Sequence, residues 1–353
     1  MKIKRFYVVL FILLLGILLT SCTSATATNS WEGITASDTA VYFANGTTVV
    51  AAKADTGNVI WTYPEKPASS RLFYAAPAIA GDQIIVGDYS GLLVSIGVED
   101  GKEHWQFTGA KGRYIDAPLV INDMIIAQNA DANIYALNSN GKLIWSFKGS
   151  HAFWATPVSD GTTVYAPSLD HSLYALNLSD GKLKWKVDLG GPLIGRSVLS
   201  ADNSTLFVGT LDKTFLALNS TDGSIKWKST LKGNIWSAPV VLEDRLYVGD
   251  DSGIINMLKV SDGSVIQSID VQSPVLGNGA VMNSNIVFGD EKGEIIVLGK
   301  NGERSWTRSL TGKLYSNLIF SNDHLYVLTT KGDKPLFAYD ANGNEIWGYT
   351  VSK

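Results

Sequence analysis

The sequence predicts an all-β protein, an eight-bladed β-propeller built from four-stranded antiparallel blades. The first observation is a series of eight glycines spaced 39 to 44 residues apart, seven of which are followed four positions later by a tryptophan. The second is the composition between these glycines, where short β-branched and aromatic runs are separated by Asp-Gly, Asn-Gly and Ser-Gly dipeptides, which favour hairpin turns. After the N-terminal segment, no stretch of ten or more residues has helical periodicity.

The repeat accounts for residues 31–353, so no second domain is expected. Four strands per unit and a period near 40 residues are typical of propeller blades. A linear β-solenoid is the competing architecture, but its coils are usually shorter and it needs terminal caps that the sequence lacks. The sixth unit has Gly263 but carries Gln267 at the tryptophan position. The tryptophans of the other units are Trp61, Trp105, Trp145, Trp185, Trp227, Trp306 and Trp347.

The unit that ends at Trp227 illustrates the expected blade. Its strands are predicted over residues 197–200, 205–210, 214–219 and 225–228, with turns between them. Asp-x-x-Gly runs at residues 88–91, 250–253 and 290–293 fall between second and third strands. They lack the alternating oxygen ligands of a calcium loop, so we interpret them as hairpin turns.

One pattern, Ala-Leu-(Asn or Asp)-x-x-(Asp or Asn)-Gly-x-x-x-Trp, is clearest at residues 175–185 and 217–227. It resembles the PQQ-like, or tryptophan-docking, β-propeller repeat, and the resemblance covers all eight units, with the sixth degenerate. In that family the repeat tryptophans lie between adjacent blades. The seven tryptophans are therefore interpreted as structural, each burying roughly 150–250 Å², and Gln267 predicts a weaker seam after the sixth unit.

The N-terminus has the layout of a secretory signal peptide over residues 1–21, with early positive charges and an uncharged run at 6–19. That run is too short to span a bilayer as a helix. The residues Leu-Thr-Ser-Cys at 19–22 resemble a bacterial lipobox, and Cys22 is the single cysteine of the chain. We therefore expect a lipidated Cys22, a short tether over 22–30, and an extracytoplasmic protein anchored at the periplasmic face or the cell surface. An ordinary signal peptide followed by a free thiol is the alternative.

Composition argues against several classes of function. The net charge is −4 and there is no basic run, so nucleic acid is not an expected partner. One cysteine excludes an intrachain disulfide. The histidines occupy different places in different units, and no metal site is predicted from His104, His151, His171 and His324.

The resemblance also raises an enzymatic alternative, a PQQ-dependent quinoprotein dehydrogenase. Those enzymes are similar to one another in a disulfide between adjacent cysteines, a calcium site, a catalytic aspartate and long insertions. This chain has one cysteine and repeats of nearly constant length. We therefore expect no catalytic residues, no cofactor and no metal.

The loops that precede each predicted first strand supply a candidate binding face. Equivalent loop positions should form a ring around the channel on one face, and in most units they are aromatic or apolar. The ring could cap the core, or it could bind a partner or ligand, because tryptophan and tyrosine dominate binding hot spots. Arg71, Arg113, His151, Arg196 and Lys313 could supply a polar rim. The predicted ring is Trp31, Tyr74, Tyr114 (with Ile115 as a rival), Trp154, Ile194, Trp236, Leu276 and Tyr315.

Eight such blades behind a lipobox resemble the lipoproteins of the outer-membrane β-barrel assembly machinery. That resemblance implies a loop with leucines and an arginine that docks a barrel partner, and the loop Pro-Leu-Ile-Gly-Arg at 192–196 is loosely similar. The family's acidic pair is missing from the following loop, residues 233–236. We expect a monomeric, non-catalytic scaffold for envelope or surface proteins, with barrel assembly as a special case. A carbohydrate-binding surface lipoprotein is a further alternative.

Overall fold

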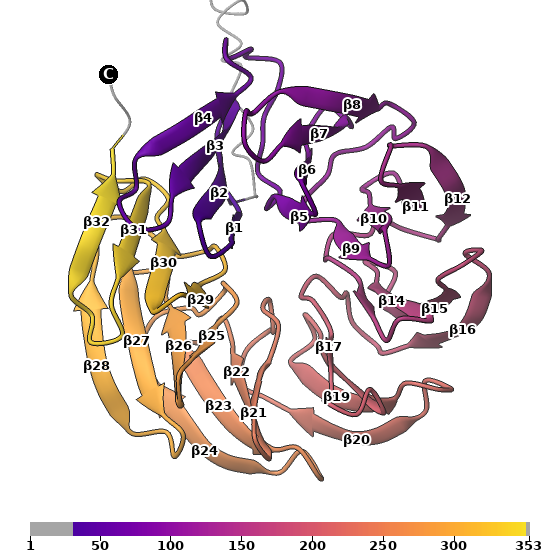
Figure 1. Ribbon diagram of the computed structural model, residues 1–353. Helices are drawn as coiled ribbons and strands as arrows, with labels where there is room; N and C mark the ends of the chain where they lie inside the picture. Colours follow the sequence, from indigo (N-terminus) through magenta and orange to yellow (C-terminus); the bar gives the residue numbers. More distant parts are fainter. Residues whose placement is uncertain (1–30, 351–353) are drawn as a thin grey trace, which may run out of the picture. The chain divides into compact units, whose positions relative to one another are not determined.

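The computed structural model describes residues 31–350, which form a ring of eight four-stranded antiparallel sheets (Figure 1). The strands of every sheet follow chain order, so each blade is one continuous segment. The first strand lies nearest the centre and the fourth lies at the rim. The predicted fold is confirmed, and the fifth blade's strands end within two residues of their expected limits. No helix in residues 31–350 is long and apolar enough to cross a membrane.

The first four blades cover residues 34–188. Blade 1 consists of β1 (Ile34–Ala36), β2 (Ala40–Asn45), β3 (Thr48–Lys53) and β4 (Val59–Tyr63). Blade 2 consists of β5 (Ala78–Ala80), β6 (Gln83–Gly87), β7 (Leu93–Gly97) and β8 (Glu103–Phe107). Blade 3 consists of β9 (Leu119–Ile121), β10 (Met124–Gln128), β11 (Asn133–Asn138) and β12 (Leu143–Lys148). Blade 4 consists of β13 (Val158–Ser159), β14 (Thr163–Pro167), β15 (Ser172–Asn177) and β16 (Leu183–Asp188).

The second four blades cover residues 198–349. Blade 5 consists of β17 (Val198–Leu199), β18 (Thr205–Gly209), β19 (Thr214–Asn219) and β20 (Ile225–Thr230). Blade 6 consists of β21 (Val240–Leu242), β22 (Arg245–Gly249), β23 (Ile254–Lys259) and β24 (Val265–Asp270). Blade 7 consists of β25 (Ala280–Met282), β26 (Asn285–Gly289), β27 (Glu294–Gly299) and β28 (Arg304–Ser309). Blade 8 consists of β29 (Ile319–Ser321), β30 (His324–Leu328), β31 (Leu336–Tyr339) and β32 (Glu345–Tyr349).

The hydrophobic core is divided among the seams between blades. Successive strand residues point to opposite faces of a sheet, so in β6 Ile84 and Val86 pack with blade 1 while Ile85 packs with blade 3. Each apolar cluster draws its residues from two neighbouring blades in this way. A single sheet cannot bury both of its faces, and the closed ring supplies a neighbour for each of them.

A β-bulge precedes the tryptophan position in every blade. In blade 4, Leu183 pairs with Leu176 and Trp185 pairs with Ala175, so Lys184 is the extra residue. The same register shift occurs in the other blades. A bulge increases the local twist of a strand, and it re-aims the following indole toward the next blade.

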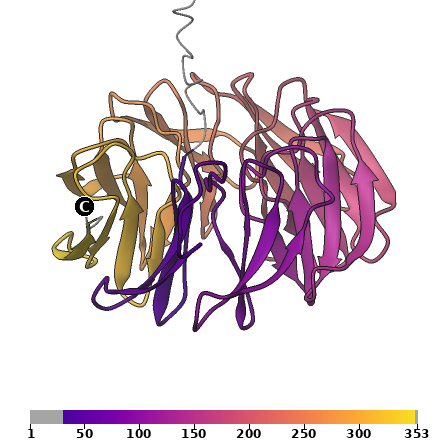
Figure 2. The same cartoon turned by 90° about the horizontal axis from the view of Figure 1, so that it is seen from above.

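The two faces of the ring carry different loops (Figure 2). The glycine turns between third and fourth strands lie on one face. The opposite face carries the interblade loops together with the turns between second and third strands, and backbone hydrogen bonds join the two sets, as from Tyr114 N to Asp88 O at 3.1 Å and from Ile235 N to Thr210 O at 3.1 Å. We call this second surface the ring face.

Candidate functional site

The seven repeat tryptophans lie in the seams between blades. Each indole N–H donates to a backbone carbonyl of the following blade at 2.7–3.2 Å. Each ring also packs on the glycine of the next unit, as Trp145 does on Gly181. The acceptors, in blade order, are Val98, Ser139, Leu178, Ser220, Val260, Ala341 and Ala54. These indoles are therefore engaged in holding neighbouring blades together.

The seam after blade 6 uses different groups. Gln267 is exposed. The carbonyl of Lys300 occupies the place of the carbonyl that accepts an indole N–H in the other seams. This carbonyl accepts hydrogen bonds from the guanidinium of Arg245 and, at 2.5 Å, from the hydroxyl of Tyr247. Arg245 also donates to Asn301 Oδ1 at 2.9 Å. The seam therefore lacks the buried area of an indole but keeps its carbonyl hydrogen-bonded.

The predicted binding-face residues occupy equivalent places in the interblade loops, with one correction. Tyr114 is only 1% exposed, and the residue at the ring position of blade 3 is the half-buried Ile115. This loop has one inserted residue, so the ring position comes one residue later after the repeat tryptophan position, Trp105, than in blades 4 to 8. The ring is therefore Trp31, Tyr74, Ile115, Trp154, Ile194, Trp236, Leu276 and Tyr315, all half-buried.

A second, inner set of side chains caps the core beneath this ring. It consists of the residue that precedes the ring position in blades 2 to 8. Members of the set are at most 1% exposed: Phe73, Tyr114, Phe153, Leu193, Ile235, Val275 and Leu314. Because these side chains already close the ends of the seams, the ring residues above them remain partly open to solvent.

Three ring residues gather into one aromatic cluster. Trp31 stacks on Tyr315 with ring centroids 4.5 Å apart, and Trp236 is tilted against Trp31 at 6.3 Å. The Tyr315 hydroxyl donates to Glu291 Oε1 at 2.6 Å, and Lys313 Nζ approaches the same oxygen at 2.5 Å. Blades 1, 6 and 8 thus contribute neighbouring rings to one apolar surface beside an ion pair.

A second group of rings lies on blade 2, beside an arginine from the loop that leads into blade 3. Tyr74 and Tyr89 have ring centroids 4.7 Å apart, and the guanidinium carbon of Arg113 lies 5.2 Å from the centre of the Tyr89 ring. Of the other expected rim residues, Arg71 forms an ion pair with Asp88 at 2.9 Å. The ring face therefore presents aromatic surface next to cationic side chains, as protein interfaces often do.

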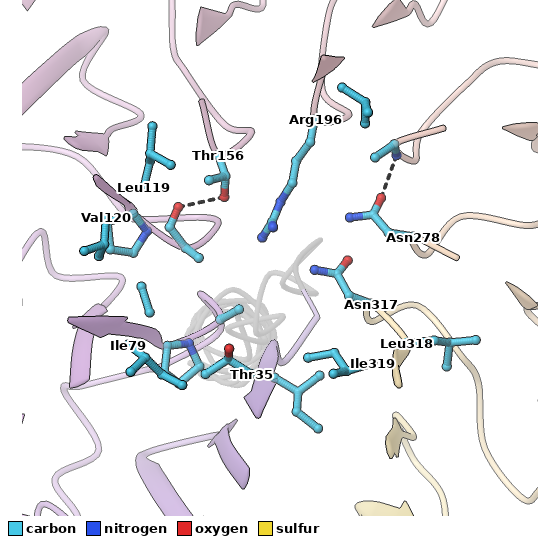
Figure 3. A pocket seen from close by; sticks show the side chains of 18 of the residues that line it. Thr35, Ile79, Leu119, Val120, Thr156, Arg196, Asn278, Asn317, Leu318 and Ile319 are labelled. Carbon is cyan, nitrogen blue, oxygen red and sulfur yellow. Dashed lines mark hydrogen bonds between the residues drawn. The ribbon is translucent and has the colours of Figure 1, made fainter. Parts of the chain in front are cut away.

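A central channel of about 600 Å³ opens among the first strands of the blades (Figure 3). Arg196, expected at the rim, instead projects into this channel and forms a two-pronged ion pair with Asp116, with Nε–Oδ2 at 2.8 Å and Nη2–Oδ1 at 2.6 Å. The backbone N–H groups of Ala117 and Thr156 also donate to Asp116. Burial acts to raise the pKa of Asp116, but the charge of Arg196 and these hydrogen bonds hold it below its usual value.

The loop at residues 192–196 differs from the docking loop that its resemblance implied. Leu193 is fully buried in the seam between blades 4 and 5, and Arg196 is bound to Asp116. Only Pro192 and Ile194 present partly exposed apolar side chains at this point. The leucine and arginine of this loop therefore have roles inside the propeller.

Several residues of the site were not predicted from the sequence. Asp116 immediately follows a ring position, and Asn278 and Asn317 stand two residues after one. Equivalent loop positions in a propeller lie in one layer, so the two positions that follow each ring residue are the sequence signal for channel residues. Glu291 lies in a turn between second and third strands, and its contact with Tyr315 follows only from the packing of adjacent loops.

The eight-bladed ring with indole seams defines this protein as a PQQ-like repeat β-propeller. The profile of the family described as outer membrane protein assembly factor BamB matches residues 45–192, 140–280 and 253–353, and the chain belongs to this family. It is 26% identical over 274 residues to the BamB of Yersinia pestis, covering 71% of this chain and 68% of that one. Against the BamB of Taylorella asinigenitalis it is 23% identical, covering 56% of this chain and 46% of that one.

The solved structure of BamB from Moraxella catarrhalis has the same fold. It superposes with a TM-score of 0.73 at 19% identity, covering 85% of this chain and 91% of that one. The match to the curated relatives is less complete, since the chain spans about half to two thirds of the length of those first matched. A shorter match, 28% identical over 137 residues, is to a putative dehydrogenase of Paracoccus denitrificans and covers 23% of that protein.

Proposed function

We propose that this protein is a non-catalytic scaffold of the bacterial envelope that binds a protein of outer-membrane assembly through its ring face. Family membership supports the assembly role, because the related proteins are named outer membrane protein assembly factors. The half-buried ring carries the proposal: inner side chains such as Phe153 and Ile235 already close the core, so Trp154 and Trp236 are not needed for that purpose. Partly exposed tryptophans of this kind are typical hot-spot residues.

Lipidation of Cys22 is the second part of the proposal, and it falls outside the described residues. Blade 1 begins at Ile34, shortly after Trp31, which lies on the ring face. The segment 23–30 reaches at most roughly 27 Å. An anchor at Cys22 would therefore hold the propeller close to a membrane, where an outer-membrane partner is found.

The dehydrogenase alternative has less support. The quinoprotein features implied by the repeat include adjacent cysteines, and this chain has only Cys22. The repeat tryptophans are engaged in the seams, and the channel holds an arginine–aspartate pair between blades 3 and 5. These groups have structural partners, which favours binding over redox chemistry.

The proposal is tested by co-purification from the protein's own envelope. The wild-type protein should retain an outer-membrane β-barrel protein, and Trp154→Ala and Trp236→Ala should each lower the recovered amount at least about ten-fold, as hot-spot truncations of 2 kcal/mol or more do. Ile144→Ala is the matched control, because Ile144 is also a large apolar residue, 48% exposed, on the rim strand β12. Equal recovery with all variants, or retention on glycan beads that only the ring variants lose, would overturn the proposal.

A further inference from the structure

The wall of the central channel is divided by chemistry. Blades 1 to 3 contribute mainly apolar side chains, among them Ile34, Ile79 and Leu119. Blades 4, 5, 7 and 8 contribute most of the polar ones, beside the apolar Leu318 and Ile319 of blade 8. These polar side chains converge on the channel in Figure 3: Thr156, Arg196, Asn278 and Asn317. A volume of about 600 Å³ lies within the usual range of small-ligand sites, which combine an apolar wall with a few convergent polar groups.

The polar side of the channel presents several hydrogen-bond donors that are not used within the described part of the protein. Arg196 uses Nε and Nη2 on Asp116, which leaves the Nη1 edge of a planar group with five N–H donors. Asn278 accepts from Ala238 N through Oδ1 at 2.6 Å, which leaves its NH₂ group. Among residues 31–350 the Asn317 amide has no hydrogen-bond partner, and the hydroxyl of Ser197 in the same wall is buried without one.

Asp116 holds the guanidinium in a fixed orientation. Its carboxylate is itself fixed by backbone N–H groups of Ala117 and Thr156, at 2.8 and 3.0 Å. The Nη1 edge of Arg196 is therefore free within residues 31–350, and Figure 3 shows the Arg196 and Asn317 side chains both extending into the channel. A guanidinium can bind one carboxylate on each of two edges, and its planar donors match carboxylate geometry.

We propose that the central channel is a binding site for a carboxylate attached to an apolar group. The carboxylate would accept hydrogen bonds from the free edge of Arg196 and from the amides of Asn278 and Asn317. The apolar group would lie against Ile34, Ile79 and the other side chains of blades 1 to 3. A free organic acid and the C-terminal residue of a polypeptide share this chemistry, and the site does not depend on the partner surface proposed above.

Calorimetric titration of the full-length protein tests this site with N-acetyl-leucine and a tripeptide, acetyl-Ala-Ala-Leu, each as the free acid and as the amide. Both acids should bind, and each amide should bind at least about ten-fold more weakly, since charge-assisted hydrogen bonds are about twice as strong as neutral ones. If the tripeptide acid binds more tightly than N-acetyl-leucine, the carboxylate comes from a polypeptide C-terminus. If the two acids bind equally, the ligand is a free organic acid. Acids and amides that bind alike, or no binding at millimolar concentration, would overturn the proposal.

Two variants make the test independent of folding. Asn317→Asp keeps the size of a side chain that has no structural hydrogen bond, and it places a negative charge in the site, so acid binding should fall more than about ten-fold at unchanged melting temperature. Asn140→Asp adds the same charge at an exposed turn between β11 and β12 and should leave binding unchanged. Equal binding by Asn317→Asp and the wild type would show that the ligand lies elsewhere.

Discussion

Trp347 of the last blade packs on Gly57 of the first, and its indole N–H donates to Ala54 O at 2.9 Å. A Cβ added to Gly57, whose φ is +71°, would lie 2.5 Å from Trp347 Cε3. Blades 1 and 8 exchange no strand. The ring is therefore closed by the same indole–glycine contact that joins six of the seven internal seams. Side-chain hydrogen bonds such as Asn322 Nδ2 to Asp38 O, at 2.7 Å, add to it.

The closing seam should respond to loss of its indole differently from an internal seam. Trp347→Ala and Trp145→Ala remove equally buried rings, 9% and 8% exposed, and each should lower the free energy of unfolding by about 3–5 kcal/mol. Blades 1 and 8 have no peptide connection, so Trp347→Ala should also speed hydrogen exchange in both, as measured by mass spectrometry. If Trp145→Ala speeds hydrogen exchange in blades 1 and 8 as much as Trp347→Ala does, this prediction is wrong.

The seam glycines are expected to be less replaceable than other glycines with positive φ. Gly181 has φ +70° and an added Cβ would lie 2.5 Å from Trp145 Cε3, whereas Gly46 has φ +61° and open space around it. Gly46→Ala should cost only the left-handed backbone strain, about 1–2 kcal/mol. Gly181→Ala should cost a further 1–3 kcal/mol, roughly the penalty of overpacking. Urea denaturation of the two variants measures the difference, and equal midpoints would show that the indole moves away freely.

Asp290 should destabilise the protein at neutral pH. It is fully buried; Oδ1 accepts from Glu294 N at 2.8 Å, but Oδ2 has no hydrogen-bond partner among residues 31–350. Asn129 holds the equivalent turn of blade 3, and its amide donates to Gly112 O at 2.9 Å. Asp290→Asn should therefore raise the free energy of unfolding by about 1 kcal/mol at pH 7.

The pH dependence of that difference has a defined sign. Burial raises the pKa of Asp290 above the usual 3.8, so the folded state binds a proton more tightly than the unfolded state. The penalty for the charged form is complete at pH 7 and disappears as the pH falls through the raised pKa toward 3.8. Wild type and Asp290→Asn should therefore converge in stability in acid, as thermal melts can show. A gap that widens toward low pH would contradict this assignment.

Membrane attachment should depend on Cys22. Cys22→Ser removes the thiol that lipidation requires, and the protein should move from the membrane fraction to the soluble fraction. Fractionation followed by immunoblotting measures this change. Ser24→Cys in the wild type is a suitable control, because it adds a thiol without removing Cys22 and should leave attachment unchanged. Continued membrane association of the Cys22→Ser variant would contradict the anchor proposal.

Local sequence was sufficient for most of the fold and for part of the site. Turn dipeptides and strand runs lie within a few residues of each other, so the strands of blade 5 could be placed closely. The same spacing located Trp154 and Trp236 on the ring face. It failed at Tyr114, because one inserted residue changes which side chain reaches the core, and a count along the chain does not measure burial.

The repeat by itself determined the number of blades, the strand order and the positions of the seven seam tryptophans, because each depends on contacts within one unit or between consecutive units. Only the tertiary structure decided that Arg196 reaches Asp116, 80 residues away, and that Trp347 meets Gly57. The first pair comes together through the curvature of blades 3 to 5, and the second only when the ring closes, so the rotation between successive blades decides both contacts. No local pattern encodes it.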